Sequence, residues 1–160
     1  MSRTGVPTKA ERWPGSPRVT PFTRRGWRDA VARLRILGVR VERQAGRVAV
    51  AVSLGHDGEV ATGQVDRPAA ETEAPRVAAE ATLEALRQIA PLRTHWVLEQ
   101  AVITAIAAGR GVIVDVVLET EDREEHLIGS ALSLSAPLEE AAARAVVDAV
   151  ERRLGWLIRT

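Results

Sequence analysis

Histidine has the widest chemical range of the side chains in this sequence, because there is no Cys for thiolate catalysis, disulfides or Cys-ligated metals. The three histidines are His56, His95 and His126. His56 and His126 flank corresponding segments of an internal repeat, and the neighbouring Asp57 and Glu125 could add carboxylate ligands to a metal. Their spacing matches no established ligand pattern, and acidic hairpin tips are commonly solvated turns. We therefore predict no metal site.

The sequence also lacks the motifs that mark an active site or a nucleotide-binding site. It has no nucleophile elbow, P-loop or dinucleotide fingerprint, and GHDGE at 55–59 is typical of a turn. The paired carboxylates Glu139 and Glu140 fall in the first turn of an expected helix, where they complement the positive end of its dipole. These observations predict a protein that is not an enzyme and uses no cofactor.

Charge is divided unevenly along the chain. Residues 1–28 hold seven Lys or Arg side chains and one Glu, a net charge of +6, which leaves −5 for the rest of a chain whose total is +1. Several prolines and the absence of an apolar period predict a disordered basic tail over 1–23. Such a tail is either simply solvated or a weak contact for nucleic acid. The candidate contact residues are Arg12, Arg18, Arg24, Arg25 and Arg28.

An internal repeat organises the rest of the chain. AGRVAVAVSL begins at Ala45 and AGRGVIVDVVL begins at Ala108, and both are followed by a second period-2 run and a long Ala-rich helical run. At an offset of 64 the apolar positions of the two strands coincide, and so do those of the two helices. The superposed strand positions are Val48, Val50, Val52 and Leu54 on Val112, Val114, Val116 and Leu118. We infer a duplicated structural unit.

Each repeat has three period-2 runs before its helical run, which predicts a βββα unit. Short connections make the strands antiparallel meanders, and one helix should cover one face of each sheet. The expected fold is therefore α+β, with two tandem βββα units packed as one domain. The first unit, with a lead-in helix at 24–34 or a lead-in to its first strand, covers 24–90, and the second covers 91–160.

The faces turned away from the helices are unusually apolar or small. In VIVDVVLE the period of a strand places Ile113, Asp115 and Val117 opposite the helix-facing valines. The corresponding residues of the first unit are Ala49, Ala51 and Ser53. An apolar strand face without a covering helix is usually buried by another unit, a second chain or a ligand. We therefore predict that these six residues form an interface or a ligand site in a homodimer.

The order of strands, small residues and Ala-spaced helix, from ATGQV to AAEATLEAL and from LIGSALSL to AAARAVVDAVERRL, resembles the C-terminal regulatory domain of 2-isopropylmalate synthase. The resemblance covers about residues 34–155 and implies a stand-alone pair of βββα units without a catalytic barrel. It further implies a regulatory dimer that binds a small effector between its units.

The αβββα order from 24–34 onward is also similar to a tandem double-stranded-RNA-binding fold. That similarity leaves an RNA-associated protein as the alternative, although a body of net charge −5 repels a polyanion. No segment has the length and apolar character of a membrane span, and we expect a cytoplasmic protein.

Overall fold

The computed structural model describes residues 33–90 and 94–157, with side chains described through Leu154. The chain divides into a unit at Met1–Ala30 and a unit at Val31–Thr160, and all described residues belong to the second. The predicted tail at 1–23, the candidate contact arginines and most of the lead-in segment therefore lie outside the described residues. Arg33 and Leu34, the described end of that segment, are not helical and lead directly into the first strand.

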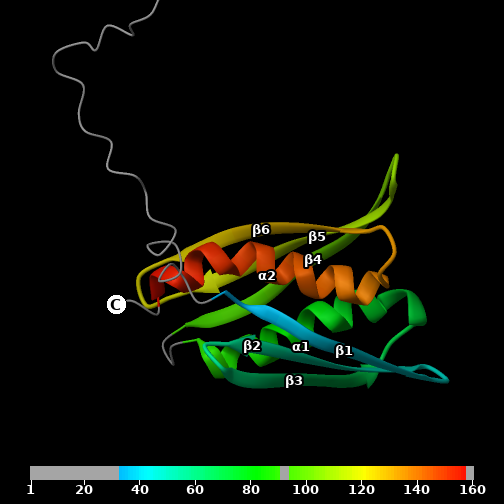
Figure 1. Ribbon diagram of the computed structural model, residues 1–160, viewed down its shortest axis with the longest axis horizontal. Helices are drawn as coiled ribbons and strands as arrows, with labels where there is room; N and C mark the ends of the chain where they lie inside the picture. Colours follow the sequence, from blue (N-terminus) through cyan, green and yellow to red (C-terminus); the bar gives the residue numbers. More distant parts are fainter. Residues whose placement is uncertain (1–32, 91–93, 158–160) are drawn as a thin grey trace, which may run out of the picture. The chain divides into compact units, whose positions relative to one another are not determined.

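The described residues form two βββα units, which confirms the predicted α+β fold (Figure 1). The first unit consists of β1 (Arg35–Gln44), β2 (Arg47–His56), β3 (Glu59–Pro68), a 3-10 turn at Glu71–Glu73 and α1 (Ala74–Ile89). The second consists of β4 (His95–Ile106), β5 (Gly109–Glu119), β6 (Glu124–Ser133) and α2 (Leu138–Leu157). Each sheet is an antiparallel meander, in the order β1-β2-β3 and β4-β5-β6.

Local sequence explains where these elements begin and turn. Asp57 and Gly58 both adopt positive φ, 50° and 84°, which is the conformation that a tight two-residue hairpin requires and that Asp-Gly favours. Pro75 lies in the first turn of α1, where its missing N–H costs no hydrogen bond. Along β2 the inward residues are buried and the outward ones half-buried, as period-2 alternation predicts.

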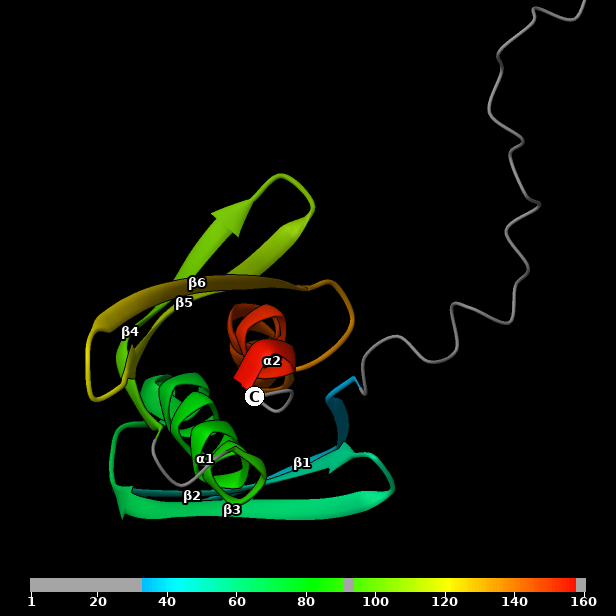
Figure 2. The same cartoon turned by 90° about the vertical axis from the view of Figure 1, so that its left-hand side faces the viewer.

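The two helices lie in one layer between the two sheets (Figure 2). α1 packs on β2 and β3 of its own unit, and also on α2 and β4. α2 packs on β5 and β6, and also on α1 and β1. The contacts are thus related by an approximate twofold, in which each helix also touches the first strand of the other unit. As a result α1 is buried on almost every side. Of the helices in the described residues, none combines the length and apolar character needed to cross a bilayer.

A glycine lets each helix approach its own sheet closely. A Cβ atom at Gly63 of β3 would lie 2.1 Å from the carbonyl oxygen of Ala81, and one at Gly129 of β6 would lie 2.1 Å from that of Ala145. Real side chains do not tolerate such distances, so only glycine fits where these strands cross α1 and α2. The same device occurs in both units.

The duplication is confirmed, but the offset of 64 holds for the helices and not for the strands. The crossing pairs Gly63 with Ala81 and Gly129 with Ala145 relate the helices by 64 positions and β3 to β6 by 66. A bulge interrupts β1 between Ile36 and Gly38 and β4 between Leu98 and Gln100, 62 positions later. The tight turns closing the β1–β2 and β4–β5 hairpins are also 62 apart, at Gln44↔Arg47 and Ile106↔Gly109.

The structural equivalents of Val50 and Val52 are therefore Val112 and Val114, and not Val114 and Val116 as the sequence alignment predicts. The longer β5–β6 hairpin and the shorter loop before α2 restore the offset of 64 in the helix. A shift of two residues leaves every side chain on its original face, so the prediction of inward and outward residues is unaffected.

Candidate functional site

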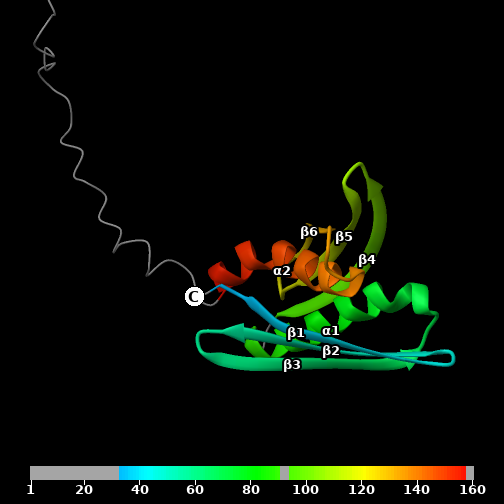
Figure 3. The same ribbon diagram turned by 45° about the vertical axis from the view of Figure 1, so that its right-hand side comes forward.

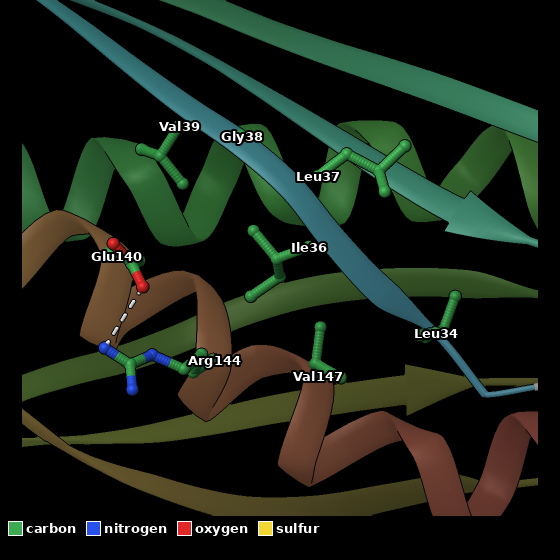
Figure 4. A pocket seen from close by; sticks show the side chains of 8 residues that line it. All are labelled: Leu34, Ile36, Leu37, Gly38, Val39, Glu140, Arg144 and Val147. Atoms are coloured by element: carbon green, nitrogen blue, oxygen red, sulfur yellow. Dashed lines mark ion pairs between the residues drawn. The ribbon is translucent and has the colours of Figure 1, made fainter.

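A hollow of about 420 Å³ lies between β1 of the first unit and α2 of the second (Figure 4). We call it the β1–α2 hollow. Its lining consists of Leu34, Ile36, Leu37, Gly38, Val39, Glu140, Arg144 and Val147. The volume falls within the range of small-molecule sites, about 300–1,000 Å³. Two smaller hollows, of about 120 and 80 Å³, lie elsewhere on the described residues.

The bulge in β1 shapes one wall of the β1–α2 hollow. The ladder with β2 is irregular between Ile36 and Gly38, so Leu37 is left without a direct partner and is 56 % exposed. Gly38 adds no side chain, and nothing lies within 4 Å of the position where its Cβ would be. Bulges commonly redirect a side chain beside a functional site. Here the bulge leaves an open aliphatic wall.

The facing wall, on α2, carries a charged pair. Glu140 and Arg144 are one helical turn apart and form an ion pair of 3.3 Å, and each side chain is less than half exposed. Val147 follows one turn later on the same side of the helix (Figure 4). A ligand in the hollow would therefore meet aliphatic carbon along β1 and one carboxylate with one guanidinium on α2.

The approximate twofold provides an internal comparison for this hollow. The related space, between β4 and α1, is filled: Trp96, which corresponds to Leu34, is fully buried, and Leu83, which corresponds to Val147, is 2 % exposed. The carbonyl of Trp96 also accepts a 2.9 Å hydrogen bond from Arg87 Nη2 of α1. At these two equivalent places the larger side chains, Trp96 and Leu83, are buried, whereas the smaller Leu34 and Val147 line the β1–α2 hollow.

The charged residues of the two spaces are also arranged differently. Arg76 and Glu80 of α1 correspond to Glu140 and Arg144 with the charges exchanged, and they pair at 3.2 Å. Glu80 is further held by Arg67 of β3, whose Nε and Nη2 donate to it at 3.1 and 3.3 Å. The carboxylate of Glu80 is therefore shared by two arginines, whereas the Glu140–Arg144 pair borders an open hollow.

The six predicted interface residues lie on the outer faces of the two sheets. Ala49, Ala51 and Ser53 are on the outer face of β1-β2-β3, and Ile113, Asp115 and Val117 are on the outer face of β4-β5-β6. Because both helices lie between the sheets, these two groups are on opposite sides of the Val31–Thr160 unit, and one chain does not bring them together. The second unit does not cover the outer face of the first.

Two small hollows border the small residues on the outer face of the first sheet. One of about 120 Å³ is lined by Ala49, Ala51 and Gln64 among others, and one of about 80 Å³ lies beside Ala49 and Arg47. Both volumes are below the usual range for small-molecule sites, about 300–1,000 Å³. Ala49 and Ala51 border some space, but less than the β1–α2 hollow offers, and Ser53 lines neither of these two hollows.

The outer face of the second sheet is apolar, although its two central residues differ. Ile113 is 41 % exposed, whereas Val117 is 4 % exposed between Val97 and His126 of the flanking strands. Ile128 and other large apolar side chains of this sheet are also exposed. The patch comprises Val102, Ile113, Ile128 and Leu132. Burial of Val117 needs no second chain, so Ile113 and its exposed neighbours carry the prediction of an interface.

Asp115 is hydrogen-bonded to a histidine in the middle of this face. His126 Nδ1 lies 3.0 Å from Asp115 Oδ1, and this hydrogen bond and the charge of Asp115 raise the pKa of His126 above its ordinary value of 6.5. Glu124 and Glu99 raise the pKa further through their charges, and partial desolvation opposes them. The charge of the His126 side chain, which lies on an apolar surface, therefore changes with pH.

The other histidines make local pairs. His56 lies 3.8 Å from Asp57, and His95 Nδ1 lies 3.0 Å from Glu119 Oε2. Within residues 33–90 and 94–157, no group of three or more His, Asp or Glu side chains is placed to hold a metal ion.

No protein-family model matches the sequence, and no curated protein does. The β1–α2 hollow must therefore be judged on its own geometry. The residues of the β1–α2 hollow could not be predicted from the sequence, because only a comparison of Leu34 with its equivalent, Trp96, would indicate them. That comparison requires the offset of 62, which the strand pattern alone does not distinguish from 64.

Proposed function

We propose that this protein is a non-enzymatic regulatory module that acts as a homodimer and binds a small molecule in the β1–α2 hollow. The observation that carries the proposal is the difference between two equivalent spaces of the fold. One is filled by Trp96 and Leu83, and the other is left open by Leu34 and Val147. The layout shared with a regulatory domain built from two βββα units is in keeping with this function.

The lining supports a ligand with an apolar body and a charged head. Aliphatic side chains from β1 would contact the body and gain from its removal from water. At the α2 wall, Arg144 can donate a pair of hydrogen bonds to an anionic group, and Glu140 can accept from a cationic or hydroxyl group. Binding would replace the exposed Glu140–Arg144 pair, which by itself is worth little in water.

The proposal can be tested with anilinonaphthalene sulfonate, a fluorescent probe that has an aromatic body and an anionic head. Wild-type protein should show a saturable site for the probe. Leu34→Trp should remove that site, because the new side chain would fill the hollow as Trp96 fills the related space. Arg144→Gln should weaken the site, because the sulfonate loses its charged donor.

Val60→Trp is the matched control, since Val60 is 64 % exposed on β3 and does not line the hollow. This variant should keep the site, and both tryptophan variants should remain as stable as the wild type. If Leu34→Trp and Val60→Trp bind the probe equally well, the hollow is not a ligand site.

Association with nucleic acid is the second candidate function, and the observation in its favour is the charge of +6 over residues 1–28. The described residues, 33–90 and 94–157, would oppose such contact, because their acidic side chains outnumber their arginines. Nucleic acid would therefore be held through the basic segment alone, with the strong salt dependence of phosphate contacts.

A further inference from the structure

The free edge of β4 is formed by an apolar segment that has no charged side chains to prevent pairing with another strand. β4 is an edge strand, and beyond β5 and α1 no described element packs substantially against it. From Gln100 to Gly109 the sequence is QAVITAIAAG, with no charged residue. Val102, Ile103 and Ile106 are 39 %, 42 % and 37 % exposed. The closed end of the hairpin that β4 forms with β5 points away from the helices (Figures 1 to 3).

The first unit contains the same hairpin in a protected form. At the 62-residue offset, Arg40, Glu42 and Arg43 of β1 correspond to Val102, Thr104 and Ala105 of β4. Arg43 is also tied to Glu139 of α2 by an ion pair. Charged side chains on an edge strand are the usual means of preventing association through its free backbone groups. The chain thus protects one of two equivalent edges and leaves the other open.

We propose that β4 pairs with β4 of a second copy of this chain, in an antiparallel arrangement that joins the two β4-β5-β6 sheets into one. This deepens the homodimer part of the proposed function by naming its surface. It does not depend on the ligand hollow.

The sequence of the edge fits a twofold register centred on Thr104. A twofold axis normal to the sheet places Thr104 opposite its own copy and Val102 opposite Ile106 of the second copy. Thr–Thr pairs and pairs of β-branched residues are favourable cross-strand neighbours. Thr104 is also the midpoint of the run from Gln100 to Ala108, so the whole uncharged segment can pair with itself.

Charge supports self-pairing at β4 and opposes it at β1. In the register centred on Thr104, Glu99 falls opposite Gly109 and no like charges meet. The equivalent register of β1 would place Glu42 opposite its own copy, which is destabilising. In the joined sheet, the exposed side chain of Val102 would lie beside Ile106 of the second copy, so apolar side chains as well as backbone groups would meet at the seam.

The first experiment measures mass by sedimentation equilibrium. The wild type should be a dimer, and Thr104→Glu should have half that mass with unchanged circular dichroism, because it places two carboxylates opposite each other. Thr62→Glu is the matched control, an exposed position on the edge strand β3 of the other sheet, and should remain a dimer. A Val117→Asp variant would not serve, because Val117 is already buried within one chain and its loss would test folding.

Two further variants test the register. An equal mixture of Thr104→Glu and Thr104→Lys should form a heterodimer, because opposite charges then face each other. Since the chain has no Cys, a lone Thr104→Cys should form an interchain disulfide on oxidation, and Thr62→Cys should not.

A monomeric wild type, or a Thr104→Glu variant that stays dimeric, would overturn the proposal. A dimeric wild type without heterodimer formation or crosslinking at Thr104 would also overturn it. Probe binding lost with Leu34→Trp reports on the hollow alone, so either proposal can fail without the other.

Discussion

Replacement of Gly63 by Ala should weaken the fold strongly, because it places a methyl group against the backbone of α1. The new Cβ would lie 2.1 Å from the carbonyl oxygen of Ala81 and 2.3 Å from the backbone nitrogen of Ala85. Cβ atoms essentially never approach other heavy atoms within 3.0 Å, so α1 must retreat from β3 by nearly 1 Å. No rotamer change can relieve the contact, because both opposing atoms belong to the helix backbone.

The size of the effect follows from what that retreat separates. A gap of about 0.5–1 Å forfeits roughly a quarter to a half of the dispersion energy of each contact across it. Leu83 and Leu86 are fully buried residues of the same helix, so several large side chains lose packing together. Overpacking usually costs about 1–3 kcal/mol, and we expect about 3 kcal/mol or more here. In a domain of this size that loss lowers the melting temperature by about 10 °C.

Urea denaturation followed by circular dichroism measures this cost as a change in midpoint at constant slope. Gly129→Ala should behave in the same way, because its Cβ would lie 2.1 Å from the carbonyl oxygen of Ala145. Gly38→Ala is the control: its Cβ would meet nothing within 4 Å, and its stability should stay within about 0.5 kcal/mol of the wild type. If Gly63→Ala proves as stable as Gly38→Ala, the helices do not touch the strand backbone and the packing described above is wrong.

Two further outcomes concern charge. In Asp115→Asn the pKa of His126, followed by nuclear magnetic resonance titration, should fall towards 6.5, because the hydrogen bond and negative charge that raise it are lost. Because the raised pKa belongs to the folded state, the Asp115–His126 pair stabilises the fold below pH 6.5 and loses that effect as pH rises through the folded-state pKa. Wild type and variant should therefore differ in stability at low pH and converge above the folded-state pKa. An equal difference in stability at all pH values would exclude the linkage. Removal of residues 1–28 should leave the thermal stability unchanged and abolish any binding of RNA or DNA. In the full chain, that binding should already disappear at a few hundred millimolar salt. Tight, salt-resistant binding by the trimmed chain would favour the nucleic-acid function instead.

The elements of the fold could be predicted from sequence because their patterns are local. Alternation in VAVAVSL and the Ala-rich helical runs specify strand and helix, and short Gly-containing turns make the strands antiparallel. The face of each strand residue could be predicted for the same reason. Even the unusual outer face of the second sheet was visible, and Ile113 is exposed there as the pattern indicates.

Register and the contact between the units could not be predicted, and both have a physical reason. A period of two is unchanged by a shift of two residues, so the pattern that identifies β2 and β5 cannot distinguish an offset of 62 from one of 64. The bulges at Ile36/Gly38 and Leu98/Gln100, together with the turns that close the two hairpins, establish the offset of 62. Val117 shows the same limit, because its burial depends on Val97 and His126, which pair with it only in the folded sheet.

A comparison of equivalent positions in the two units shows which residues the fold requires and which it only tolerates. Gly63 and Gly129 are alike because any helix that crosses a strand so closely needs glycine, whatever the protein does. Trp96 shows that the space between a first strand and the opposite helix can be filled, so stability does not require Leu34 and the hollow it leaves.

The edge strands lead to the same conclusion. Glu42 and its neighbouring arginines show that this hairpin tolerates charge, so folding does not require the apolar edge around Thr104. An open hollow and an unprotected edge each reduce the stability or solubility of an isolated chain. At the equivalent positions, the other unit has a buried Trp96 in place of Leu34 and a charged edge in place of the apolar one. This difference is the reason to seek a ligand at the β1–α2 hollow and a second copy of the chain at the edge of β4.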